Sequence, residues 1–357
     1  MTRIAEITVT GGVDTHKDFH VAAALDQMGR LLGTEQFPSS SDGYRQLDAW
    51  LRSFGELDVV GIEGTGSWGA GLSRFFRREG IEVREVNRPN RQRRRKGKSD
   101  PADAISAARS VQSGEASGLP KAGGGPVESI RVLRVTRRSA VKARTQALNQ
   151  IKGLIDTAPD ELRERFIHLP NHALITSIRR FRQVGAPGLT HLKTSLKLLA
   201  GRVIELDQEV TQLDELLAEL LKSTAPTLMG IRGVGPESAG ALLVAAGDNP
   251  DRLRSEPSFA SLCGVSPLDA SSGRQQRHRL NRGGDRQANC ALFRIVLCRL
   301  AWDQQTKTYM ARRIAEGKTK REVIRCLKRY VAREVFAALQ SDFGCQLPER
   351  QAAPRAA

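Results

Sequence analysis

Aromatic residues make up only 5% of the 357-residue chain, and acidic residues are outnumbered, with 39 Asp and Glu against 56 Lys and Arg. The net charge of +17 favours a polyanionic partner. No apolar run approaches the roughly 18 to 20 residues that a membrane span requires, and the amino-terminal segment does not resemble a secretory signal. We therefore expect no membrane partner and a bacterial, cytoplasmic, nucleoid-associated protein.

Cysteine is also scarce. The five cysteines all lie in the last third of the chain and include no C-x-x-C pair. This pattern argues against a disulfide framework or a zinc site, because both need closely spaced or paired cysteines. Reduced thiols packed as small apolar side chains are the simpler interpretation.

The length allows more than one domain, since domains usually hold about 100 to 200 residues. Short β-rich runs at residues 7–13, 19–25, 30–37, 59–63 and 82–86 predict strands. Helical patterns cover 44–54 and 67–78, and a last helix is expected to begin with Asp100 as its cap and Pro101 at its first position. The order βββαβαβα predicts an α/β RNase H-like (RuvC-like) domain over residues 1–115.

The remaining chain is predicted to be mostly helical. A linker at 113–126 precedes a long helix at 127–156, and leucine and valine then recur from Leu189 to Leu220 at spacings alternating three and four. This heptad pattern predicts an α-helical coiled-coil domain over 127–222, which forms either an antiparallel hairpin within its own chain or a dimerisation coil. A mostly α carboxy-terminal domain is expected at 223–345, followed by a disordered tail at 346–357.

Four carboxylates stand where the predicted domain can bring them together. Asp14 follows the first strand, Glu63 ends the buried strand VVGIE, and Asp100 and Asp103 open the last helix one turn apart. Carboxylate oxygens are the ligands that Mg2+ prefers, and two such ions can drive phosphoryl transfer. The sequence therefore predicts a magnesium site.

Each acid also has a simpler interpretation. Asp-Pro-x-Asp is an ordinary helix start, so Asp100 and Asp103 can serve as a cap and a first-turn acid. Asp14 can be a turn residue, and Glu63 a solvated strand end. An acid directly after an apolar strand must be compensated if it is buried, which makes Glu63 the most discriminating of the four.

Two basic stretches accompany the acids. The first leads into Asp100 and holds seven cations without an acid: Arg88, Arg91, Arg93, Arg94, Arg95, Lys96 and Lys98. The second follows helical spacing on the helix at 127–156: Arg131, Arg134, Arg138 and Lys142. A charge run is often only a solvated face, but we interpret both as contacts to a nucleic-acid backbone, which position a strand without reading its sequence.

The carboxy-terminal region holds two further candidates. In LMGIRGVGPESAGALL, Gly233 and Gly235 lie in a turn between helical segments, which predicts a helix-hairpin-helix whose glycines let backbone N–H groups approach a phosphate. Downstream, a Ser-Ser-Gly turn is followed by cations suited to a phosphate pocket: Arg274, Arg277, Arg279 and Arg282. Chemistry alone does not single out a serine there, because such a turn is usually only flexible.

The motifs GVDTHKD, IEGTG, KSDPADA, GVGPESA and SPLDASSG followed by RGGD occur in this order. In these motifs the chain resembles the DEDD-type insertion-sequence transposases of the IS-one-ten family, which are described as bridge-RNA-guided recombinases. The resemblance spans most of the chain, although between Val127 and Lys222 it is one of pattern only.

The resemblance implies a function. Asp14, Glu63, Asp100 and Asp103 would bind Mg2+, and Ser272, the serine directly before glycine, would attack DNA to give a covalent phosphoserine. The carboxylates of one subunit would meet the serine of another in a homodimer or tetramer. A structured guide RNA would pair with the DNA of the element ends and of the target. His278 is one candidate for the base that takes the serine proton, or else a phosphate-facing ring.

Two other functions fit the same residues. A Holliday-junction-resolvase-like nuclease would use the carboxylates with water as the nucleophile and would leave no covalent adduct. A non-enzymatic nucleic-acid-binding protein would use the acids only as caps and turns, so that Glu63→Ala would leave its function intact.

Overall fold

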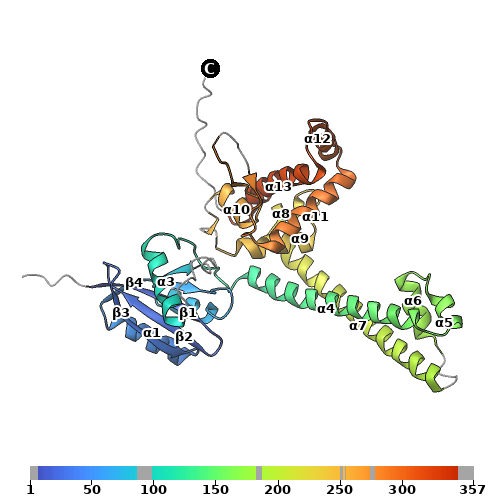
Figure 1. The fold of residues 1–357 in the computed structure, drawn as a ribbon, viewed down its shortest axis with the longest axis horizontal. Coiled ribbons are helices and arrows are strands. Elements are labelled where there is room, and N and C mark those ends of the chain that lie inside the picture. Colours follow the sequence, from blue (N-terminus) through green and yellow to red (C-terminus); the bar gives the residue numbers. More distant parts are fainter. Residues whose placement is uncertain are drawn as a thin grey trace, which may run out of the picture. The chain divides into compact units, whose positions relative to one another are not determined.

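The computed structural model describes residues 7–86, 99–181, 187–249, 252–253, 255–273 and 278–344. The chain forms two compact units, residues 1–125 with 246–259 and residues 126–245 with 260–357 (Figure 1). Among the described residues, no helix is long and apolar enough to cross a membrane.

The amino-terminal unit is built on a five-stranded sheet in the order β3-β2-β1-β4-β5. Its strands are β1 (Thr8–Thr15), β2 (Phe19–Leu25), β3 (Leu31–Pro38), β4 (Glu56–Glu63) and β5 (Glu82–Val86), and its helices are α1 (Ser41–Arg52), α2 (Ala70–Arg78) and α3 (Asp100–Gln112). β1 pairs antiparallel with β2 and parallel with β4, and β5 continues the parallel half. This mixed sheet fits the predicted RNase H-like α/β fold. Every expected strand and helix is present; the strands at 19–25 and 82–86 have the predicted bounds, and most other elements have shifted ends.

The two faces of the sheet carry different helices. On one face Val13 and Ile62 pack in the main core with Leu47 of α1 and Phe76 of α2. Because side chains alternate along a strand, their neighbours Asp14 and Glu63 point to the opposite face, which α3 covers. The register Val13 with Ile62 sets the ends of β1 and β4 side by side.

Glycine lets α3 lie directly on the strands. An added Cβ at Gly12 would lie 2.3 Å from the carbonyl oxygen of Ala104 and 2.3 Å from the amide nitrogen of Ala108. An added Cβ at Gly61 would meet Val111 at 2.6 Å. Backbone therefore packs on backbone along the face that carries the acids, and Ala104 and Ala108 are fully buried there.

Replacing Gly12 with alanine is expected to destabilise the amino-terminal unit by about 1 to 3 kcal/mol, because the methyl group overpacks a rigid backbone contact. Thermal unfolding of the full chain measures the effect. Gly66→Ala is the matched control, since Gly66 has nothing within 4 Å of an added Cβ. Equal melting temperatures for the two variants would show that α3 does not press on β1.

In the second unit two long helices, α4 (Pro126–Asp156) and α7 (Pro187–Thr224), pack side by side (Figure 1). The short helices α5 (Asp160–Phe166) and α6 (Asn171–Arg179) lie between them in the chain and share their core. Arg137 pairs with Asp214 across the two long helices, as Arg144 does with Asp207.

The heptad residues of α7 lie on the side of the helix that packs against α4. Leu196, Val203, Val210, Leu213 and Leu217 are all at most 8% exposed. These five of the ten pattern residues are thus buried within their own chain, and the other five are partly buried. A coiled-coil geometry, a dimerisation contact and the boundary between residues 127–222 and 223–345 stay predictions.

The rest of the described chain is mostly helical. Its helices are α8 (Pro226–Gly230), α9 (Pro236–Ala246), α10 (Glu256–Leu262), α11 (Arg286–Trp302), α12 (Gln304–Ala315) and α13 (Lys320–Asp342), and its strands are β6 (Leu268–Asp269) and β7 (His278–Arg279). Gly233 has a φ of +83° in the turn between α8 and α9, a backbone conformation that favours glycine. The helix-hairpin-helix assignment itself stays a prediction, and the tail at 346–357 lies outside the described residues.

Candidate functional site

The ends of β1 and β4 carry the first two predicted acids. Asp14 is 8% exposed and Glu63 is 9% exposed, so neither is a solvated turn or strand end. The hydroxyl of Thr15 donates to the carbonyl oxygen of Glu63 at 2.9 Å and ties the two strand ends together. The chain then turns sharply at Gly64, whose φ of +68° lies in the left-handed region. Both carboxylates are therefore held at one edge of the sheet, on the face of α3.

The other two acids come from the first turn of α3. The expectation that Asp100 caps this helix is wrong by one residue, because Ser99 is the N-cap and Asp100 is already helical. The Asp100 carboxylate instead lies 3.4 Å from Nε2 of His16. Asp103 lies one turn further along the helix. Because α3 packs closely on Gly12 and Gly61, its first turn lies next to the carboxyl ends of β1 and β4.

Electrostatics shows that the other three carboxylates act on Asp14. Burial raises the pKa of Asp14 above its usual value, His16 lowers it, and the charges of Glu63, Asp103 and Asp100 raise it further. A carboxylate with a raised pKa in the folded state costs folding free energy once it is ionised. A divalent cation among these groups would offset that repulsion, and the acidic donor set fits such an ion.

His16 completes the cluster. Its Nε2 lies 3.2 Å from Asp14 and is buried, yet no side chain of the described residues meets hydrogen-bond geometry with it. Asp14, His16 and Asp100 each offer one ligand atom, and these atoms lie within 4.8 Å of one another. Three donors so close together have the spacing of a shared metal ion. The ring is steadied by Phe19, with the centroids 4.8 Å apart.

Removing the imidazole is expected to weaken divalent-ion binding by about 10- to 100-fold, a typical loss for a group that supports a metal site. Calorimetric titration of His16→Ala with Mn2+ measures it. His191→Ala, on the exposed side of α7, is the control. An unchanged Mn2+ affinity in His16→Ala would exclude the histidine from the ligand set.

The predicted nucleophile lies on an exposed loop of the other unit. Ser272 stands between β6 and β7, a two-residue antiparallel pair in which Asp269 faces His278. Asp269 accepts hydrogen bonds from the amide and hydroxyl of Ser271, and these bonds are the main cause that lowers the pKa of Asp269. Within the described chain, the Ser272 hydroxyl has no such partner. Gly273 follows with a φ of +58°, a backbone conformation that favours glycine.

The structure describes only some of the basic residues that were predicted to contact nucleic acid. The tract from Arg88 to Lys98, with Arg274 and Arg277, lies outside the described residues. Arg279 and Arg282 are exposed beside the serine loop. On α4, Arg138 and Lys142 are exposed, and Arg131 is exposed but held by Glu128, which raises its arginine pKa.

Arg134 departs from the predicted stripe on α4. It is 4% exposed, and its guanidinium donates to Glu237 at 2.9 Å and to Gln287 at 3.3 Å. Its stem also lies against Gly240, where an added Cβ would approach it to 2.7 Å. The prediction that Arg134 contacts nucleic acid is therefore wrong: this arginine joins α4 to α9 and α11 inside its unit.

Two family models match the chain. Residues 11–158 match the DEDD-type IS110 model, described as a transposase, and residues 225–311 match the transposase model of the IS116/IS110/IS902 family. The chain belongs to the IS110 (IS-one-ten) family of transposases. The resemblance read from the sequence motifs is thereby confirmed.

Curated relatives agree with this family assignment. An insertion element IS110 protein of 43.6 kDa from Streptomyces coelicolor is 29% identical over 160 residues, which are 44% of this chain and 39% of that protein. A probable family 20 transposase of Pseudomonas aeruginosa is 26% identical over 164 residues, 44% of this chain and 46% of that protein. An insertion element IS900 protein of 42 kDa from Mycobacterium paratuberculosis is 26% identical over 157 residues, 43% of this chain and 39% of that protein. The matched segments thus cover less than half the length of each relative.

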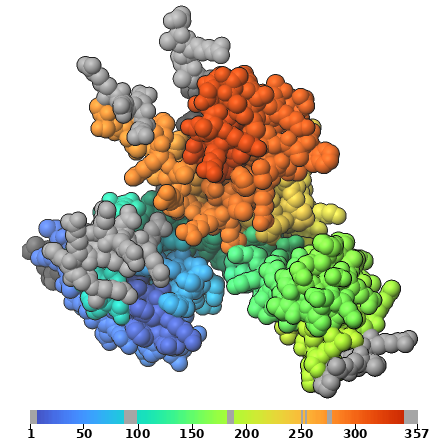
Figure 2. Space-filling view, turned by 45° about the vertical axis from the view of Figure 1, so that its right-hand side comes forward, coloured from blue at the N-terminus to red at the C-terminus, as the bar shows by residue number. Residues whose placement is uncertain are grey.

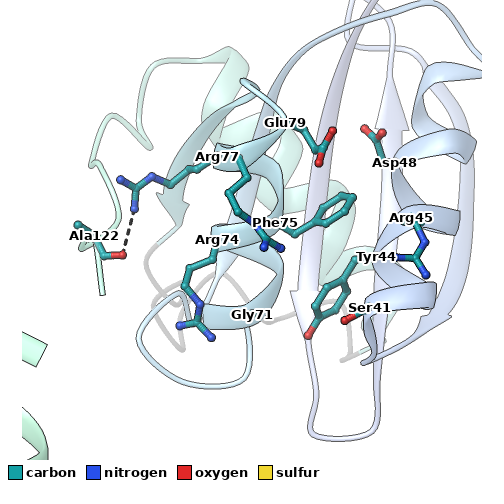
Figure 3. A pocket seen from close by; sticks show the side chains of 11 residues that line it. Ser41, Tyr44, Arg45, Asp48, Gly71, Arg74, Phe75, Arg77, Glu79 and Ala122 are labelled. Atoms are coloured by element: carbon teal, nitrogen blue, oxygen red, sulfur yellow. Dashed lines mark hydrogen bonds between the residues drawn. The ribbon is translucent and has the colours of Figure 1, made fainter. Parts of the chain in front are cut away.

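Sequence reasoning on this IS110-family chain missed His16, although it stands two residues after Asp14 within the quoted motif. It also missed a groove of about 1170 Å³ between α1 and α2, floored by Tyr44 and Phe75 (Figure 3). Arg74 and Arg78 line it without a carboxylate partner among the described residues. The sequence does show two arginines four residues apart, Arg74 and Arg78, on the helix that became α2. Only the fold places them beside α1.

Proposed function

We propose that this chain cuts and rejoins DNA as the transposase, or recombinase, of an insertion sequence. One observation carries the proposal: Asp14, Glu63, Asp100, Asp103 and His16 gather at one edge of an RNase H-like sheet. If these acids had only a structural role, each carboxylate would be expected to bond the backbone of its own helix start or turn. Instead, Asp14 is buried and carries an unfavourable charge interaction with the other three.

The carboxylates and His16 are the groups that would hold divalent cations, with Mg2+ as the proposed ion. When bound, such ions polarise a phosphodiester and stabilise the leaving oxygen. The protein's own contribution is to position the donors. Burial on the α3 face keeps Asp14 and Glu63 from turning into solvent, and the α3 turn fixes the separation of Asp100 and Asp103.

We further propose Ser272 as the nucleophile. Its oxygen would form a bond to the phosphorus while one phosphorus–oxygen bond of the DNA backbone breaks. The serine proton must pass to a base, and the leaving sugar oxygen must gain a proton. The phosphoserine keeps the phosphodiester energy for rejoining, so no ATP is needed. Both Ser271 and Ser272 are exposed. The hydroxyl of Ser271 donates to Asp269, whereas that of Ser272 has no such partner within the described chain, which supports Ser272.

The partners belong to the proposal as well. DNA ends and target DNA are the proposed substrates, and the net charge of +17 suits them. A structured guide RNA and a homodimer or tetramer follow from the family resemblance. The exposed cations Arg138, Lys142, Arg279 and Arg282, and the turn at Gly233 and Gly235, are proposed backbone contacts.

One assay tests the proposal. The full chain is incubated with element-end DNA and the RNA transcribed from the element, in Mg2+, in Mn2+ or in chelator. We expect strand cutting and joining only with the divalent ion, together with a DNA strand that stays attached to the denatured protein. Cut ends without an attached strand would favour the water-using nuclease, and activity in chelator would contradict the metal site.

A further inference from the structure

The helices α12 and α13 bring together two of the three tyrosines of the chain. Tyr309 and Tyr330 meet edge to face, with ring centroids 5.7 Å apart, and Tyr330 is 46% exposed. Burial and a hydrogen bond with Tyr330 raise the pKa of Tyr309 to about 12, so the Tyr309 ring stays neutral. In the space-filling view these carboxy-terminal helices form an outer surface of their unit (Figure 2).

Guanidinium groups surround the two rings. Arg312 and Arg313 lie 5.4 and 6.0 Å from the centroid of Tyr309, and Arg333 lies 5.9 Å from that of Tyr330. We call this surface, with the helical row described next, the tyrosine–arginine face. Planar cations beside an exposed ring such as Tyr330 provide flat surfaces on which other flat groups can stack.

A row of cations runs along α13 next to Tyr330. Arg325, Arg329 and Arg333 follow one another every four residues and therefore line one side of the helix. Burial and the charge of Arg333 lower the pKa of Arg329, and burial and the charge of Arg325 lower that of Lys328. Like charges at this spacing destabilise a helix. The row therefore suits a partner that supplies negative charge.

The neighbouring carboxylates are outnumbered by cations. Residues 303–344 hold ten Lys and Arg against five Asp and Glu. Three of the acids bind away from the face: Asp303 to Arg232 and Thr306, Glu334 to Arg299, and Asp342 to the backbone amides of Thr227 and Leu228. Glu316 pairs with Arg312 and Arg313 of the face, and Glu322, in a capping box with Thr319, also interacts with the charge of Arg325. The segment thus keeps an excess of five positive charges, which suits a negatively charged ligand.

We propose that the tyrosine–arginine face binds single-stranded nucleic acid. An unpaired strand offers bases to stack on Tyr330 and the adjacent guanidinium planes, and phosphates at regular spacing for the row on α13. A duplex hides its base faces and would use only the cations. An acidic protein would use the cations too, but it would gain little from the exposed ring. The proposal rests on the proposed function only in that such an enzyme handles unpaired strands.

The test measures binding of the full chain, in chelator, to a fluorescent 20-nucleotide strand made once as DNA and once as RNA. Tyr330→Ala is expected to weaken binding at least about fivefold, the loss of one stacked base, and Tyr330→Phe to retain it. Arg325→Gln/Arg333→Gln should make the plot of log binding constant against log salt concentration less steep. The slope should fall by roughly one to one and a half, since each phosphate contact on a single strand contributes about 0.7 to it. Duplex binding should respond to the arginine pair and not to Tyr330→Ala.

The control is Lys152→Gln/Arg202→Gln, which removes the same charge from exposed positions of α4 and α7. Equal losses in both double variants would reduce the effect to net charge and overturn the proposal. So would unchanged strand binding in Tyr330→Ala, or complete competition by polyglutamate. If the variants lose binding only to the RNA strand or only to the DNA strand, that result identifies which nucleic acid the face binds. Asp14→Asn should bind normally, so failure of DNA cutting and failure of this face remain distinguishable.

Discussion

Asp14→Asn is expected to lower metal-dependent strand cleavage by roughly a thousand-fold or more, while the protein becomes more stable without metal. The rate loss follows because a metal held at the reacting phosphate contributes several kcal/mol to the transition state, and each 1.4 kcal/mol is about tenfold. Asparagine fills the same volume but lacks the charge that the cluster uses. A cleavage assay in Mg2+ or Mn2+ measures the rate.

The gain in stability follows from the pKa of Asp14, which burial and three neighbouring acids raise. A raised carboxyl pKa means that the folded state holds its proton more tightly than the unfolded state. Stability is therefore lost as the pH rises from the usual value of 3.8 through the folded value. Asparagine does not ionise, so this loss should disappear. Thermal unfolding in chelator between pH 4 and pH 8 shows it as a flatter profile.

Asp18→Asn is the matched control, because Asp18 is exposed four residues further along the chain. It should leave both cleavage and the pH profile unchanged. If Asp14→Asn cut DNA at the wild-type rate, the proposed metal site would be wrong. If it lost activity and stability together, the change would reflect misfolding rather than chemistry.

Ser272→Ala is expected to abolish the covalent protein–DNA strand and to lower strand joining by at least about 10⁴-fold, because loss of a nucleophile removes the entire covalent route. Folding should be unaffected, since the side chain is exposed and has no hydroxyl partner within the described residues. The readout is a labelled DNA strand that migrates with the denatured protein.

The adjacent serine supplies the control for that result. Ser271 donates its hydroxyl to Asp269 and is thereby committed to the turn, so Ser271→Ala should retain the covalent strand and most of the joining activity. An adduct that survives in Ser272→Ala and disappears in Ser271→Ala would reverse the assignment. An adduct in both would move the nucleophile away from this loop.

The strands and helices of the amino-terminal unit follow closely from local patterns. The run VVGIE and the Asp-Pro start are strong signals because apolar alternation and proline geometry act within a few residues. The same locality explains why the N-cap of α3 was predicted one residue too late. Ser99 and Asp100 are both good N-cap residues, and which of them caps the helix depends on what else the Asp100 carboxylate contacts. Here His16 lies 3.4 Å from Asp100, and no spacing rule includes that contact.

The role of Arg134 illustrates a second limit. Its spacing with Arg131, Arg138 and Lys142 places it on one side of α4, but spacing does not say what covers that side. Glu237 lies about one hundred residues further along the chain and pairs with Arg134 in a buried contact. Burial of a cation is decided by the partner that compensates it, and that partner is distant in sequence.

By itself the sequence determined the class of the fold, the identity of the four acids, the heptad pattern of α7 and the family, because each depends on residue type and short spacing. The tertiary structure decided which groups share a site. Gly12 and Gly61 admit α3 to within backbone contact of the sheet, and this close approach brings Asp100 and Asp103 to Asp14, with His16 beside them. Such proximity arises from packing between elements far apart in the chain. Local patterns place the acids at the ends of their elements, but they do not include the contact of His16 with Asp100.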